Sequence, residues 1–221
     1  MNVAIFGATG MVGSGVLIEC LRDELVESVL CIGRNRTSRK HPRLNEIVLE
    51  DFLDYQPIRE ELSNLDACFF CMGVSAVGMK EADYTRITHD FTLAAAQAVL
   101  AASPGITFCY VSGQGTDSTE RGRLMWARVK GRTENALLRL PFRSFMFRPG
   151  FIQPAPGVES RTGLYRTFYK ITRPLFPAVR RLFPGHVTTS ENLGRAMIRV
   201  ARKGFPKPIL ETADINDLAV P

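Results

Sequence analysis

The chain has 221 residues, 45% of them hydrophobic, and a formal net charge of +6 at pH 7. This is the composition of an ordinary globular protein, and the length suits one domain with a full core, so we expect a single domain over residues 1–221. No apolar run approaches the roughly 18 residues of a membrane-spanning helix. The first predicted strand begins at residue 2, which leaves no room for a signal peptide, and we expect a cytoplasmic protein.

The cysteines favour the same compartment. They are Cys20, Cys31, Cys68, Cys71 and Cys109, an odd number placed mostly in predicted strands, where a buried free thiol is typical. Cys68 and Cys71 have CxxC spacing, but a strand would turn them to opposite faces, and no second pair completes a zinc site. We therefore expect no metal site and no disulfide framework.

Three glycines mark the start of the chain. The apolar segment 2–6 is followed by Gly7, Gly10 and Gly13, and then by a helix-like stretch. In a dinucleotide site the first glycine makes the tight turn, the second lets the pyrophosphate approach the backbone, and the third allows close packing of helix and sheet. Free N–H groups at the helix start would hold the phosphates. The predicted cofactor-binding residues here are Gly7, Ala8, Thr9, Gly10, Met11, Val12 and Gly13; the alternative is a glycine-rich turn without a ligand.

Strands and helices alternate along the first two-thirds of the chain. Predicted strands lie near 2–6, 28–33, 45–49, 66–72, 106–111 and 143–148, and predicted helices near 11–23, 57–63, 79–102 and 124–139. Strands separated by helices need crossover connections, which give a parallel sheet with helices on both faces. The sequence therefore predicts an α/β, doubly wound, Rossmann-type fold, with ligands bound at the carboxyl ends of the strands.

Basic residues follow the second strand, where an NAD-binding protein usually carries an acid for the ribose hydroxyls. Arg34 and Asn35 stand there instead, and a guanidinium can hold a 2′-phosphate. This favours NADP over NAD, although a solvated basic loop is the alternative. After the third strand, Asp51 and Phe52 would border the adenine or form a polar turn.

At this point the sequence resembles the atypical members of the short-chain dehydrogenase/reductase superfamily, the GxxGxxG proteins related to the NmrA-like and Tat-interacting oxidoreductase-like groups. The resemblance is carried, in the order of that family, by Gly7, Gly10, Gly13, Arg34, the turn 51–54, Cys71-Met72-Gly73, Ser112, Lys130-Gly131 and Arg148-Pro149-Gly150. It implies an NADP-dependent oxidoreductase or isomerase-like fold whose substrate pocket is formed by the C-terminal segment. It also implies cofactor contacts at Met72, Gly73, Pro149 and Phe151.

The resemblance further implies a catalytic set. In such enzymes a serine positions the substrate carbonyl, a tyrosine transfers the proton, and a lysine four residues later lowers the pKa of the tyrosine and holds the nicotinamide ribose. Ser112 and Lys130 match, and both are also predicted to contact the cofactor, but the tyrosine position holds Trp126. An indole N–H donates a hydrogen bond but is not a practical proton donor.

Several roles remain open for this site. Tyr84, Tyr165 or a water on Lys130 could supply the proton; Trp126 could form a stacking wall, or simply pack on the core; or the protein could bind NADP without turnover.

The C-terminal third is basic. Residues 121–181 contain fourteen Lys or Arg and two acids, which suits an acidic small-molecule substrate. We expect no nucleic-acid partner, because no recognition motif accompanies the charge. Residues 150–189 are predicted to form a small helical substrate lid, beginning with a loop at 151–154, and this explains the amphipathic stretch at least as well as peripheral membrane contact does.

After this lid we expect a helix from Ser190 to about Arg202, capped by Ser190, and then a short strand and a loop.

The sequence as a whole predicts an NADP-binding reductase or epimerase acting on a small carbonyl or hydroxyl compound, as a monomer or homodimer. The alternative is a catalytically silent NADP-sensing regulatory or partner-binding protein.

Overall fold

A parallel sheet forms the centre of the computed structural model, which describes residues 1–155 and 185–220. In these residues seven strands pair in the order β3-β2-β1-β4-β5-β6-β9, and every pair is parallel. The strands are β1 (Asn2–Phe6), β2 (Ser28–Gly33), β3 (Leu44–Val48), β4 (Ala67–Phe70), β5 (Thr107–Val111), β6 (Arg143–Arg148) and β9 (Ile209–Glu211). The prediction of a doubly wound α/β fold is confirmed.

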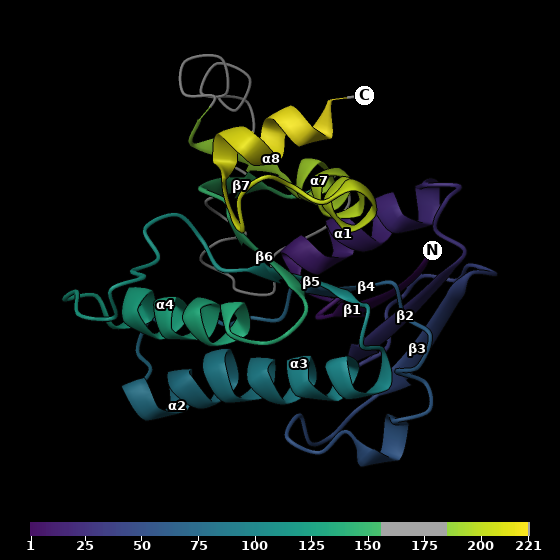
Figure 1. Cartoon of the computed structure of the whole chain (residues 1–221), viewed down its shortest axis with the longest axis horizontal. Helices are drawn as coiled ribbons and strands as arrows, with labels where there is room; N and C mark the ends of the chain where they lie inside the picture. Colours follow the sequence, from purple (N-terminus) through teal and green to yellow (C-terminus); the bar gives the residue numbers. More distant parts are fainter. Residues whose placement is uncertain (156–184, 221) are drawn as a thin grey trace.

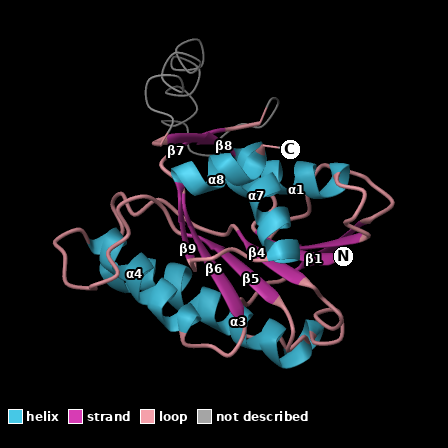
Figure 2. Ribbon diagram, turned by 45° about the horizontal axis from the view of Figure 1, so that its top comes forward, coloured by secondary structure: helices cyan, strands magenta, loops and turns pink. Residues whose placement is uncertain are grey.

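Helices cover both faces of this sheet (Figures 1 and 2). One face carries α1 (Met11–Arg22), α7 (Ser190–Lys203) and α8 (Thr212–Ala219), and the other carries α3 (Phe91–Ala102) and α4 (Met125–Leu138). Side chains alternate between the two cores as a strand requires: Val3 and Ile5 pack on the α1 side, whereas Ala4 and Phe6 pack on the α3 side.

Small residues let α1 and α7 approach closely. A Cβ at Gly194 would lie 3.0 Å from Val16 Cα, and one at Gly15 would overlap the Ser190 side chain. The C-terminal helix α7 is therefore part of the layer that covers the sheet, next to the helix that follows the glycine turn.

Two predicted helices differ from those observed. The predicted helix at 79–102 is divided into α2 (Glu81–Thr85), a π-helical segment, η2 (Arg86–Asp90), and α3. At 57–63 the structure has only the 3₁₀ helix η1 (Gln56–Ile58) followed by turns, because apolar spacing over so few residues does not distinguish a helix from a series of turns.

The C-terminal part also departs from the prediction. The expected loop at 151–154 contains β7 (Phe151–Gln153), which pairs in parallel with β8 (Val187–Thr189). Helix α7 is capped by Thr189, whose hydroxyl accepts the Asn192 N–H, and not by Ser190. The expected final loop is helix α8, which a capping box between Glu211 and Asp214 initiates.

The predicted lid lies mostly outside the described residues, which include only 150–155 and 185–189 of it, and a single domain over 1–221 stays a prediction.

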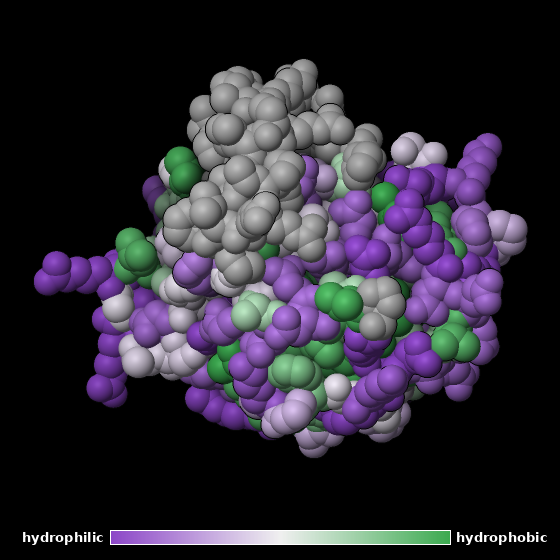
Figure 3. All heavy atoms as spheres, turned by 90° about the horizontal axis from the view of Figure 1, so that it is seen from above, coloured by the Kyte–Doolittle hydropathy of each residue, from purple (hydrophilic) through white to green (hydrophobic). Residues whose placement is uncertain are grey.

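In the described part of the basic segment, several arginines pair within the protein: Arg128 with Glu81 at 2.7 Å, Arg132 with Glu120 at 3.8 Å, and Arg148 with Glu134. No helix among the described residues is long and apolar enough to cross a membrane. The face seen in Figure 3 is mostly hydrophilic, with small groups of hydrophobic residues.

Candidate functional site

The glycine turn brings three backbone segments into contact. Gly7 has a φ of +81°, and a Cβ on it would lie 2.8 Å from the backbone N and Cα of Met72, at the end of β4. A Cβ on Gly13 would overlap the carbonyl oxygen of Gly7. Larger residues at either position would force β1, the end of β4 and helix α1 apart.

Helix α1 begins directly after this turn with its N–H groups uncapped. Gly10 is the N-cap residue and offers no side chain, and the first turn of α1 contains no acid. The N-terminus of a helix carries a partial positive charge, so this one is suited to a phosphate.

A cavity of about 720 Å³ runs across the carboxyl ends of the central strands from this turn. Of the predicted site residues it is lined by Gly7, Thr9, Gly10, Met11, Val12, Arg34, Asn35, Phe52, Met72, Gly73, Ser112, Trp126, Lys130, Pro149 and Phe151. The structure thus brings together residues that follow six different strands and two residues of helix α4.

Three predicted residues do not line the cavity. Ala8 is buried in the core, Gly13 is packed inside the turn, and Asp51 is exposed, its carboxylate accepting the Leu53 N–H. Sequence reasoning did not include several lining residues, among them Val74, Ser75, Gln114, Gly150 and Ile152. Each lies within a few residues of a strand end, which is the signal that could have identified them.

Arg34 lies at one end of the cavity, next to the carboxyl end of β2. Its side chain is exposed, and it makes no ion pair within the described part of the chain. A guanidinium in this state is available to an anionic ligand.

At the other end, the hydroxyl group of Ser112 is bound inside the protein. Ser112 is 4% exposed, and its Oγ lies 2.5 Å from Glu134 Oε1 and 3.1 Å from the carbonyl oxygen of Phe147. Both partners are acceptors, so the single hydroxyl proton is shared between them. In this arrangement Ser112 has no proton to donate to a ligand in the cavity.

Glu134 is the residue at this end that sequence reasoning missed. Its side chain is fully buried and is bound by both Nε and Nη2 of Arg148, with Nε at 3.0 Å from Oε1. This hydrogen bonding raises the pKa of Arg148. Because Glu134 follows Lys130 by four residues on α4, helical spacing could have placed both on one face.

Lys130 combines a cavity position with an altered pKa. Its Nζ donates a hydrogen bond to the Ser112 carbonyl oxygen. Burial lowers the pKa of the ammonium to about 8, and the nearby Glu134 carboxylate opposes this effect. A lysine with this pKa can gain or lose a proton near neutral pH.

The tyrosines considered as proton donors do not face the cavity. Tyr84 is 2% exposed and does not line it, and burial raises the pKa of its phenol. Tyr165 lies outside the described residues. Trp126, one helical turn before Lys130, does line the cavity.

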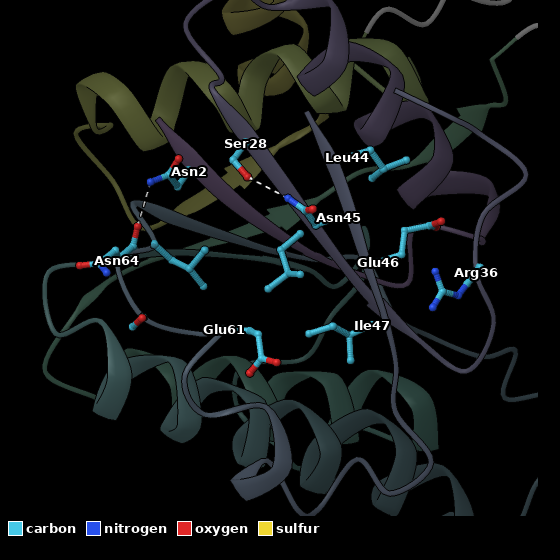
Figure 4. Close-up of a pocket in the computed structure, with 12 residues that line it drawn as sticks. Asn2, Ser28, Arg36, Leu44, Asn45, Glu46, Ile47, Glu61 and Asn64 are labelled. Carbon is cyan, nitrogen blue, oxygen red and sulfur yellow. Dashed lines mark hydrogen bonds between the residues drawn. The ribbon is translucent and has the colours of Figure 1, made fainter. Parts of the chain in front are cut away.

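A second cavity of about 620 Å³ lies at the edge of the sheet, toward the opposite ends of the strands (Figure 4). Its polar groups partly bind one another: Asn2 donates to the Asn64 carbonyl at 3.1 Å, and Asn45 lies 3.4 Å from the Ser28 hydroxyl. None of the predicted cofactor or catalytic residues lines it.

In the described residues all five cysteines are free, and no group of His, Cys, Asp and Glu is arranged to hold a metal ion.

Comparison with known proteins finds relatives in sequence and neighbours in fold. The rat protein HTATIP2 (Rattus norvegicus) is 29% identical over 175 residues, which cover 76% of this chain and 70% of the rat protein. The mitochondrial protein fmp52-2 of Aspergillus oryzae is 25% identical over 97% of this chain and 95% of its own. A short-chain dehydrogenase family protein from Francisella tularensis superposes with a TM-score of 0.63 at 15% identity, covering 92% of this chain and 91% of that one. The chain is similar to proteins of the atypical short-chain dehydrogenase/reductase superfamily in sequence and in fold.

A further solved structure has the same fold. The Bordetella bronchiseptica enzyme WbmF, solved in complex with NAD⁺, superposes with a TM-score of 0.67 at 14% identity over 98% of this chain and 76% of that one. No protein-family model matches the chain.

One expectation is overturned by these relatives. The sequence predicted a cytoplasmic protein, whereas fmp52-2 and other fungal relatives are named as mitochondrial proteins. Free cysteines are compatible with both compartments and therefore could not distinguish between them.

Lys130 should react with an amine reagent at an unusually low pH. We expect labelling with acetic anhydride, followed by peptide mass spectrometry, to give a midpoint near pH 8 for Lys130, compared with about 10.4 for an ordinary lysine. Because the Glu134 charge raises this pKa, Glu134→Gln should move the midpoint to lower pH. A wild-type midpoint above about pH 10 would contradict the described burial of this amine.

Proposed function

We propose that this protein binds NADP(H) in the 720 Å³ cavity and is an oxidoreductase acting on a small carbonyl or hydroxyl compound. The observation that carries the proposal is the continuity of the cavity from the glycine turn and Arg34 to Lys130. One space then accommodates phosphate, adenosine and nicotinamide groups in the order that the superfamily implies.

The residues present fit a dinucleotide at the phosphate end. A side chain at Gly7 would collide with the Met72 backbone, and Gly7 and Gly10 present backbone atoms alone to the cavity. The uncapped N-terminus of α1 and the guanidinium of Arg34 would hold the pyrophosphate and the 2′-phosphate. WbmF, which was solved in complex with NAD⁺, has the same fold as this chain, and this likeness supports a nicotinamide cofactor here.

At the nicotinamide end Lys130 has the central role. When bound, the nicotinamide supplies or accepts the hydride. Lys130 Nζ, held by the Ser112 carbonyl, donates the proton to the substrate oxygen or removes it, since its pKa of about 8 permits both. Ser112 acts through its carbonyl, because its hydroxyl is bound to Glu134.

The second candidate function is NADP(H) binding without turnover, in a regulatory or partner-binding protein. Trp126 favours it, because the position expected to carry a phenol four residues before Lys130 holds an indole. The Ser112 hydroxyl also favours it, because its hydrogen bond to Glu134 leaves it no proton to donate to a substrate.

The cofactor preference is tested by calorimetric titration with NADPH and NADH. We expect Arg34→Asp to weaken NADPH binding about 10- to 100-fold, the range for loss of a charged hydrogen bond, and to leave NADH binding nearly unchanged. Arg36→Asp is the matched control, because Arg36 lines the second cavity instead. Equal losses for both nucleotides in Arg34→Asp would refute the phosphate role, and no heat with wild-type protein would refute the cofactor site.

Turnover separates the two candidate functions. With a panel of small carbonyl compounds, an oxidoreductase consumes NADPH, and Lys130→Met should lower the rate about 100-fold or more, the usual contribution of a general acid. Lys203→Met, an exposed lysine at the end of α7, should retain the wild-type rate. The wild type could instead bind NADPH without consuming it. If Trp126→Tyr then also shows no turnover, the site is built for binding.

A further inference from the structure

Trp126 forms part of one wall of the cavity beside Lys130. It is the sole tryptophan of the chain, and it lies in the first turn of α4. Its ring edge is packed against the loop after β5, since a Cβ on Gly115 would lie 3.4 Å from the indole Cη2. The largest aromatic side chain available therefore lines the cavity, and one edge of its ring is held by a loop.

That loop presents backbone instead of side chains. Gly113 has a φ of +144° and Gly115 a φ of +85°, both in the region that favours glycine. A Cβ on Gly113 would lie 3.9 Å from Lys130 Nζ and from the Pro149 carbonyl oxygen. No side chain at position 113 shields the Lys130 ammonium from the cavity.

The remaining lining adds apolar surface and positive charge. Val74, Phe151 and Ile152 line the cavity with Trp126. Among the described lining residues the charged side chains are Arg34 and Lys130, and none is an aspartate or glutamate. This end of the cavity thus combines a flat aromatic wall, apolar neighbours and one cation.

We propose that this end binds a flat aromatic compound that carries a carbonyl or carboxylate oxygen, with its ring against Trp126 and its oxygen at Lys130 Nζ. Aromatic rings stack on indole with more contact than puckered rings of the same size make. An oxygen with negative charge or a strong dipole gains a charge-assisted hydrogen bond from the ammonium. As a statement about the substrate, this inference rests on the proposed oxidoreductase function.

Two carboxylates of one carbon skeleton test it. 2-Naphthoate is flat, and decalin-2-carboxylate is its saturated, puckered counterpart. In calorimetric titrations of the protein saturated with NADP⁺, we expect 2-naphthoate to bind at least 10-fold more tightly. Trp126→Leu should reduce this ratio to about 2, Trp126→Phe should preserve most of it, and Lys130→Met should weaken both ligands together and leave the ratio intact.

An observation on the wild type makes the test independent of whether the variants fold. The chain has one indole N–H, so a ¹⁵N-labelled sample gives a single indole resonance, which 2-naphthoate should shift and decalin-2-carboxylate should not.

Equal affinities in the wild type, or a preference that survives in Trp126→Leu, would overturn the aromatic subsite. An indole resonance unmoved by 2-naphthoate would overturn it as well. A separate titration with NADP⁺ identifies failure of the proposed function: if NADP⁺ does not bind, that function falls, while the two carboxylates still test the subsite on the nucleotide-free protein.

Discussion

At Gly7 the end of β1, the end of β4 and the start of α1 meet at backbone contact. The Gly7 carbonyl fills the space where Gly13 has no side chain, and the Met72 backbone fills the space beside Gly7 itself. This contact sets the position of the N-terminus of α1 relative to the strand ends. The cavity lies along the segments that follow β1, β4 and β5, at Gly7, Met72 and Ser112, beside a helix start whose N-cap residue has no side chain.

A second constraint acts at the far end of the cavity, where Glu134 is buried among polar groups. An unpaired carboxylate in this position would be strongly unfavourable, and the two-nitrogen contact from Arg148 compensates it. The same carboxylate accepts a hydrogen bond from the Ser112 hydroxyl, and the Ser112 carbonyl oxygen accepts one from Lys130 Nζ. Burial lowers the pKa of Lys130 while the charge of Glu134 limits that change. One buried ion pair thus both holds the Ser112 hydroxyl and raises the pKa of Lys130 against the effect of burial.

The sequence predicted the structure correctly wherever a local pattern of residues is compatible with only one local structure. Strand-turn-helix order with glycines at 7, 10 and 13 predicted the turn, and alternating elements predicted the parallel sheet. The residues after each strand predicted most of the cavity lining, because parallel strands end at one edge. Patterns with several solutions were misread: within the expected loop 151–154, residues 151–153 form a strand because they pair with 187–189. The hydrogen bond from Ser112 to Glu134 joins residues 22 positions apart, and spacing alone cannot show which way a hydroxyl points.

The central claim is that a dinucleotide lies along the cavity from the start of α1 to Lys130, and a crystal structure of the protein with NADPH tests it most directly. We expect electron density for the pyrophosphate at the N–H groups of Met11 and Val12, for the 2′-phosphate at Arg34 and for the nicotinamide near Lys130. Density for the nucleotide in the second cavity, beside Asn2 and Asn64, or in no defined place, would contradict it.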